Sequence, residues 1–141
     1  MEVLSGLNNQ ANFTILDRDV HVHQGLRFRS ITEIRLYDAL VRRRVLVFPL
    51  PLAVLGNIGV YREPDFLVYS RTGRSGILEI HGPQYHPPET AAQEHERRRR
   101  FIDLGVNEYE IYDAERCYND PDSIAADFLK RLGRTTQYGA R

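Results

Sequence analysis

Over residues 30–41, apolar and polar positions alternate with the spacing of an α-helix. Ser30 and Glu33 have the S-x-x-E spacing of a helix capping box. The apolar positions that follow recur every three or four residues, at Ile31, Ile34, Tyr37, Leu40 and Val41. Arginines occupy positions 42–44, where cations complement the carbonyl end of a helix. The pattern predicts a first helix that begins after Ser30 and ends at these arginines.

Three strand candidates follow this helix. Residues 45–55 have a β-type composition, and Pro49 and Pro51 favour an edge or bulged strand over a central one. Residues 65–70 and 76–81 are two compact strand candidates, and the intervening residues have the composition of a hairpin loop. A β-hairpin is therefore expected in the middle of the chain.

In the second half of the chain, the pattern predicts a helix over residues 89–104, which ends at Gly105, and a strand over residues 109–112. A final amphipathic helix begins at residues 119–121 and ends at Gly133. The order of elements is α-β-β-β-α-β-α. It predicts an α/β fold in which helices flank one mixed sheet.

The two ends of the chain are harder to interpret. Residues 1–29 could form short strands around a turn at 17–19, or an extended arm. The main domain is expected over residues 30–133, and residues 134–141 are expected to be a flexible tail.

The composition of the chain excludes several classes of protein. The chain has 141 residues, which suits one domain with its own core. Its 19 basic and 19 acidic side chains cancel, which excludes a uniformly basic nucleic-acid coat but not a local basic face. Lys130 is the only lysine, and the single Cys117 excludes an intramolecular disulfide. No membrane span or signal peptide is evident, so we expect a cytoplasmic protein without a membrane partner.

The candidate chemistry lies in the hairpin. Alternate side chains of a strand share a face, so Glu79 and His81 point the same way. If the two strands pair, Asp65 lies beside them. Two converging carboxylates suit a hard divalent cation such as Mg²⁺, with Mn²⁺ as an alternative. The simpler interpretation is an acid at a turn and a solvent-facing strand glutamate.

This arrangement resembles the PD-(D/E)XK, restriction-endonuclease-like superfamily, whose core is a helix, a β-hairpin with P-D and E-x-K elements, and flanking helices and strands. Pro64 and Asp65 match P-D, and Glu79, Ile80 and His81 match E-x-K with histidine in the lysine position. The resemblance extends over about residues 28–132, toward the very-short-patch-repair endonuclease branch and its uncharacterised relatives. The matching segments are Arg29-Ser30-Ile31-Thr32-Glu33, Pro64-Asp65-Phe66, Leu78-Glu79-Ile80-His81-Gly82 with His86, and His95-Glu96-Arg97-Arg98.

The resemblance implies a metal-dependent endonuclease that hydrolyses DNA phosphodiester bonds. Asp65 and Glu79 would bind Mg²⁺, Glu33 would assist, and His81 would orient or deprotonate water. Because His81 replaces the lysine of the family, a catalytically inactive nucleic-acid-binding or assembly protein on the same fold is the alternative. Glu33 also has a purely structural explanation as the capping residue of the first helix.

The second helix and the arginines offer nucleic-acid contacts. Ala91, His95, Arg98 and Ile102 form a stripe expected to face the sheet, where His95 and Arg98 would meet the carboxylates or a phosphate, or serve as structural groups. Arg71 and Arg74 in the hairpin loop could belong to a DNA-facing rim, or be solvated.

The histidines leave a third hypothesis open. His86 is assigned to the same nucleic-acid surface through the resemblance, but His81, His86 and His95 could instead gather around a transition metal in an enzyme of another class. The oligomeric state also stays open. Because nucleases that cut both strands often act as dimers, a homodimer is among the partners considered.

Overall fold

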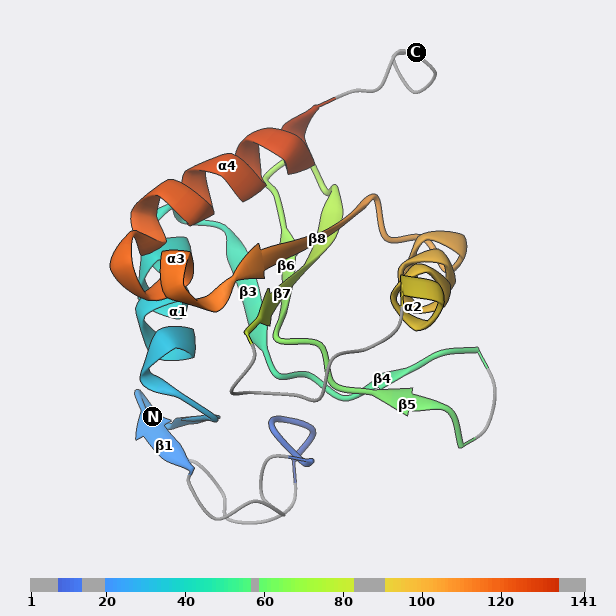
Figure 1. The fold of residues 1–141 in the computed structure, drawn as a ribbon, viewed down its shortest axis with the longest axis horizontal. Helices are drawn as coiled ribbons and strands as arrows, with labels where there is room; N and C mark the ends of the chain where they lie inside the picture. Colours follow the sequence, from blue (N-terminus) through green and yellow to red (C-terminus); the bar gives the residue numbers. More distant parts are fainter. Residues whose placement is uncertain (1–7, 14–19, 57–58, 83–90, 135–141) are drawn as a thin grey trace.

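The computed structural model describes residues 8–13, 20–56, 59–82 and 91–134 (Figure 1). The helices are α1 (Ile31–Arg42), α2 (Ala91–Asp103), α3 (Ala114–Asn119) and α4 (Pro121–Gly133). The strands are β1 (His21–His23), β2 (Leu26–Phe28), β3 (Leu46–Pro49), β4 (Ala53–Val54), β5 (Tyr61–Arg62), β6 (Phe66–Tyr69), β7 (Ser75–His81) and β8 (Glu108–Asp113).

The central sheet has four strands in the order β3-β6-β7-β8. β3, β6 and β7 pair antiparallel, whereas β8 runs parallel to β7 after the crossover through α2. This confirms an α/β fold with one mixed sheet flanked by helices. β3 is an edge strand that ends at Pro49, as the prolines predicted. The ribbon of β4 and β5 was not expected from the sequence.

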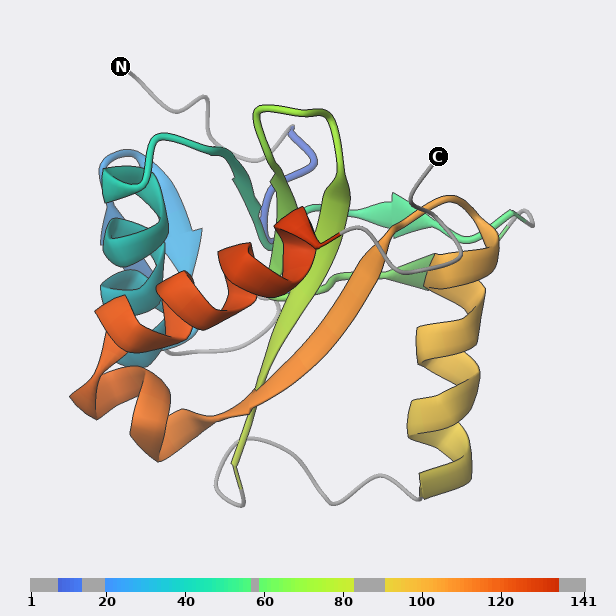
Figure 2. The ribbon, with the colours of Figure 1, turned by 90° about the horizontal axis from the view of Figure 1, so that it is seen from above.

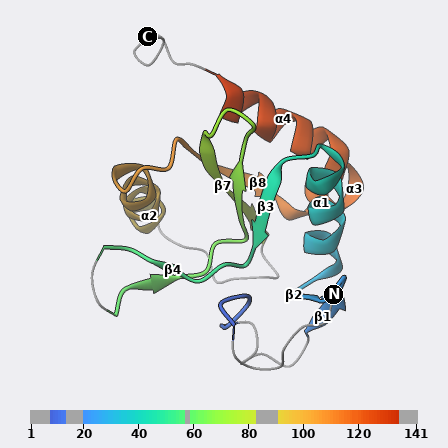
Figure 3. The ribbon, with the colours of Figure 1, turned by 180° about the vertical axis from the view of Figure 1, so that it is seen from behind.

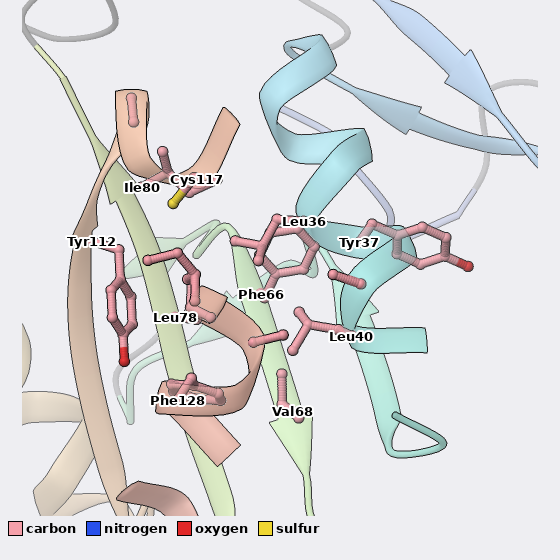
Figure 4. Close-up of a cluster of buried hydrophobic side chains, with 14 of the residues drawn as sticks. Leu36, Tyr37, Leu40, Phe66, Val68, Leu78, Ile80, Tyr112, Cys117 and Phe128 are labelled. Carbon is pink, nitrogen blue, oxygen red and sulfur yellow. The ribbon is translucent and has the colours of Figure 1, made fainter. Parts of the chain in front are cut away.

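Helices cover the two faces of the sheet unequally. In Figure 2, α1, α3 and α4 lie on one side of the sheet and α2 lies alone on the other. The larger core forms between the three helices and the sheet, where Leu78 and Ile80 of β7 pack with Phe66, Leu36 and Phe128 (Figure 4). A smaller core under α2 contains Leu55, Ile77, Phe101 and Tyr109. Both faces of β7 are therefore buried over residues 75–80.

The predicted face of α1 is partly wrong. Ser30 caps the helix, with its Oγ accepting from the backbone N–H of Glu33 at 3.2 Å. Ile31 and Val41 are exposed, however, and Leu36 is fully buried with Ala39 and Leu40. Ile31 and Val41 lie near the two ends of the helix, where they are 48% and 42% exposed.

Caps explain the C-terminal helices. Asp120 caps α4, which begins with Pro121 and buries a face of Ile124, Phe128 and Leu132, as the sequence predicted. α3 was not predicted, because a helix of six residues is too short to show a periodic pattern. Its N-cap is Asp113, the last residue of β8.

The N-terminal region joins the main core. β1 and β2 form a hairpin through Gln24 and Gly25, beside the start of α1 (Figure 3), whereas the turn expected at 17–19 lies outside the described residues. Phe28 is fully buried in the larger core. The side chain of Gln10 donates to the carbonyls of Arg27 and Pro49 at 2.9 and 3.0 Å. The expected tail, apart from Arg134, also lies outside the described part. Within that part, no helix is long and apolar enough to cross a membrane.

Candidate functional site

Three carboxylates are buried at one end of the sheet. Asp65, Glu33 and Glu79 are exposed by only 3%, 6% and 7%. Asp65 directly precedes β6, and the pairing of Phe66 with Leu78, continued by one residue, sets it opposite Glu79. Glu33 comes from the first turn of α1. The hairpin register predicted from the sequence therefore does bring Asp65 beside Glu79.

Asp65 is held by β7 and by Arg29. Its Oδ2 accepts the backbone N–H of Ile80 at 2.6 Å, and its Oδ1 accepts an N–H of the Arg29 guanidinium. Charge-assisted hydrogen bonds of this kind fix a carboxylate more firmly than neutral ones. The side chain of Asp65 thus has a defined position at the end of the hairpin.

Arg29 also binds Glu33. Its backbone N–H donates to Oε1 of Glu33 at 2.6 Å, and its Nε donates to Oε2 at 3.2 Å. The guanidinium consequently bridges Glu33 and Asp65. Glu33 therefore belongs to the capping arrangement at the start of α1 and also shares Arg29 with Asp65.

Burial raises the pKa of two of these carboxyl groups. It raises the pKa of Glu33 to about 7 and the pKa of Glu79 to about 8, and the negative charge of Asp65 adds to both shifts. Arg29 lowers the pKa of Glu33 in part, as Arg97 does for Glu79. Below about pH 7 these two carboxyl groups therefore hold protons, which a bound cation would displace.

Glu79 is linked to α2 through Tyr109 of β8. The hydroxyl of Tyr109 donates to Oε2 of Glu79 at 3.2 Å and accepts from Nε of Arg97 at 2.8 Å. Nη1 of Arg98 donates to the backbone carbonyl of Tyr109 at 2.6 Å. Burial raises the pKa of the Tyr109 hydroxyl, so it remains a hydrogen-bond donor at neutral pH.

The predicted stripe on α2 needs correction. His95 is exposed, as are Ala91 and Ile102. The side of α2 that turns toward the sheet instead carries Glu94, Arg97, Arg98 and Phe101, at i, i+3, i+4 and i+7. Phe101 is the only buried residue of α2 and determines the rotation of the helix. Arg98 faces the sheet as predicted, but it binds a backbone carbonyl and not a carboxylate.

His81 approaches α2 as well. Its Nδ1 lies 3.6 Å from Oε1 of Glu94, and its side chain is 29% exposed. His86 lies outside the described residues. Among the residues described, no set of three or more His, Cys, Asp or Glu side chains forms a group that could hold a metal ion as it stands. His95, which is exposed, gives no support to a histidine cluster.

The arginines of the hairpin loop lie away from the carboxylates. Arg71 and Arg74 follow the C-terminal end of β6, whereas Asp65 precedes its N-terminal end. Nε of Arg74 donates to the carbonyl of Leu132 at 2.6 Å, at the end of α4. These arginines therefore do not form one rim with the site. Lys130 is exposed on α4.

Oxygen ligands of this kind fit a hard divalent cation in chemical type and in charge. Asp65 lies beside Glu33 and beside Glu79, Arg29 supplies one positive charge to Glu33 and Asp65, and Mg²⁺ prefers such oxygen donors. The guanidinium of Arg29 already donates to Oδ1 of Asp65. A metal ion would therefore have to share this carboxylate with Arg29 or displace the guanidinium. Asp65 and Glu79 are the residues that would hold the ion, with Glu33 beside them.

Comparisons with family models, with curated proteins and with solved structures found no match to this chain.

Proposed function

We propose that the chain is a metal-dependent endonuclease that hydrolyses DNA phosphodiester bonds at the Asp65–Glu79 site. The observation that carries the proposal is the convergence of Asp65 with two carboxylates whose pKa values are raised by burial. Burying three acids is costly for folding, and perturbed acids at one place are typical of functional sites.

The topology supports a restriction-endonuclease-like core. A helix, three antiparallel strands, a second helix and a parallel fourth strand follow each other along the chain. The resemblance in the P-D and E-x-H segments implies such an order of elements. The positions of Asp65 directly before β6 and of Glu79 on β7 support the proposal as well.

A divalent ion held by Asp65 and Glu79 would supply Lewis-acid activation of water and offset charge on the phosphate. Mg²⁺ is the proposed cofactor, and Mn²⁺ a substitute. The protein contributes the positions of the two carboxylates, which the backbone N–H of Ile80 and the hydroxyl of Tyr109 hold in place.

His81 would take the role of the missing lysine. Its Nδ1 lies 3.6 Å from Oε1 of Glu94, and an imidazole can orient a water molecule or accept a proton from it. Glu33, whose pKa of about 7 lies close to neutral pH, is a second proton acceptor near the site.

A second candidate function rests on Arg29. Because its guanidinium bridges Glu33 and Asp65, it can act as a permanent counter-ion in place of a metal. Together with His81 in the lysine position, this favours a protein that keeps the fold, binds nucleic acid and does not cut it.

Cleavage assays separate the two. Supercoiled plasmid and duplex oligonucleotides are incubated with Mg²⁺ or Mn²⁺ and the wild-type chain, Asp65→Asn, Glu79→Gln, or the control Asp103→Asn, an exposed acid at the end of α2. We expect metal-dependent cutting by wild type and control, and a loss of at least about 100-fold in each site variant, since both remove a ligand.

Circular dichroism shows whether the site variants are folded. Cutting that survives both substitutions would rule out the proposed site. Binding of DNA without cutting by folded wild-type protein, with either metal, would favour the non-catalytic function.

A further inference from the structure

A pocket of about 450 Å³ lies between the β4–β5 ribbon and α2. Its walls are Arg62 of β5 and five residues of α2, namely Ala92, Gln93, Glu96, Arg97 and Arg100. The ribbon and the helix lie side by side in Figures 1 and 2. Three arginines and one glutamate give the pocket an excess of positive charge, although the chain as a whole has none.

The walls of the pocket are built on packed elements. Phe101 of α2 belongs to the smaller core, together with Leu55 and Val60 at the turn end of the ribbon. The backbone N–H of Leu55 donates to the carbonyl of Val60 at 2.9 Å, which closes the ribbon. The arginines therefore project from elements whose separation is fixed by packing.

Guanidinium donors are available in this pocket. Arg62 uses one N–H on the carbonyl of its neighbour Tyr61 at 2.8 Å. Arg100 has a long contact of 3.5 Å with Glu96, and both of these side chains are well exposed. An exposed pair of this kind contributes little, and each guanidinium carries five N–H donors. The pocket can consequently offer several donors to an anion.

Arg97 connects the pocket with the carboxylates. It lines the pocket and donates to the hydroxyl of Tyr109, which donates to Glu79. An anion bound in the pocket would thus contact Arg97, which is linked to Glu79 through the hydroxyl of Tyr109. Guanidinium groups match phosphate oxygens in geometry and charge.

The geometry points to the Arg62–Arg97–Arg100 pocket as a binding site for a phosphodiester group of the nucleic-acid backbone, next to the carboxylate site. This inference rests on the proposed function for the identity of the ligand as a nucleic acid. The pocket itself makes contacts that do not depend on sequence, so it would position a strand and not read its bases.

Binding without metal tests the pocket separately from catalysis. Fluorescence anisotropy of a labelled duplex is measured in EDTA over a sodium chloride series, with the full chain as wild type, Arg62→Thr/Arg100→Gln, or Arg99→Gln. Arg99 is the matched control, because it is an exposed arginine of the same helix that does not line the pocket. Arg97 is left unchanged because it also holds Tyr109.

The double variant should bind about tenfold more weakly at low salt, and its plot of log K against log salt should be less steep by about 1–2. The control should keep most of the affinity. Equal losses in both variants, no loss in the double variant, or no binding by wild type at low salt would each overturn the inference.

Two further arms separate related explanations. The affinities of wild type and double variant are compared for a duplex with a 5′-phosphate and for one with a 5′-hydroxyl. If the double variant loses affinity only for the duplex with the 5′-phosphate, the assignment of the pocket to the phosphodiester backbone is overturned. Metal-dependent cleavage is measured on the same samples. Arginine-dependent binding without any wild-type cleavage supports the pocket and refutes the proposed endonuclease, whereas cleavage with arginine-independent binding does the reverse.

Discussion

Among single residues, Arg29 has a large effect on the charges of the carboxylate site, because it pairs with two of the three acids. Its guanidinium contacts Glu33 and Asp65, and its side chain is 25% exposed, so these ion pairs are only partly screened by water. Glu79 lies beyond its hydrogen bonds and accepts from Tyr109. Burial raises the pKa of both glutamates, and at Glu33 the hydrogen bonds from Arg29 oppose that shift.

The raised pKa of Glu79 predicts how stability depends on pH. The folded chain keeps a proton on Glu79 up to about pH 8, whereas the unfolded chain releases it near pH 4.5. The folded state therefore binds more protons between these values, and the stability of the wild type falls as pH rises through this window. Glu33, whose pKa is about 7, acts in the same direction.

Glu79→Gln removes the ionisable group but keeps an acceptor for Tyr109. Without metal, it should match the wild type near about pH 5 and be more stable by about 2 kcal/mol at about pH 8.5, a gain of several degrees in Tm. Thermal unfolding by circular dichroism at the two pH values measures this. Glu115→Gln, at an exposed position of α3, is the control. A difference that does not change with pH would contradict the burial argument.

At the scale of elements, the contact between β7 and α4 depends on a glycine. A Cβ on Gly76 would lie 2.8 Å from Cζ of Phe128 and 3.1 Å from Cδ1 of Leu132. Both neighbours are fully buried, so neither can move away easily. α4 can approach the sheet this closely because position 76 has no side chain.

Gly76→Ala should therefore destabilise the protein by about 1–3 kcal/mol through overpacking. Urea denaturation measures the change. Gly133→Ala is the matched control, since nothing lies within 4 Å of a Cβ at the end of α4, and it should leave stability unchanged or raise it by up to about 1 kcal/mol. Equal effects of the two substitutions would contradict the packing described for α4.

Elements with local signals could be predicted from the sequence. The cap at Ser30, the loop between β6 and β7, and the cap and proline that start α4 depend on neighbouring residues alone. The rotation of α2 could not be predicted, because its many charged residues give a helical period with little contrast. Its orientation depends on where Phe101 packs, on a core that also includes β8.

The residues of the candidate site likewise divide into those that the sequence could place and those that it could not. Asp65 and Glu79 could be placed together because a hairpin fixes the register between neighbouring strands. Tyr109 and Arg97 join them only through the parallel pairing of β7 with β8 and the packing of α2. Those contacts link segments far apart in the chain, and no spacing of residues along the sequence encodes them.

At the scale of the whole molecule, the zero net charge conceals an uneven distribution. Buried acids collect at one end of the sheet, and arginines line the neighbouring pocket between α2 and the ribbon. Other arginines are structural, such as Arg74 at the end of α4 and Arg98 on the carbonyl of Tyr109. The preference for arginine over lysine fits this use, since the guanidinium makes several directed hydrogen bonds.

Calorimetric titration of Mn²⁺ into the full chain tests the central claim most directly. Because buried carboxyl groups must lose protons before they bind a cation, the affinity should rise with pH, and the heat should vary with the ionisation enthalpy of the buffer. Asp65→Asn and Glu79→Gln should abolish the heat while Asp103→Asn keeps it. Absence of binding above pH 8, or binding unchanged in both site variants, would contradict the account.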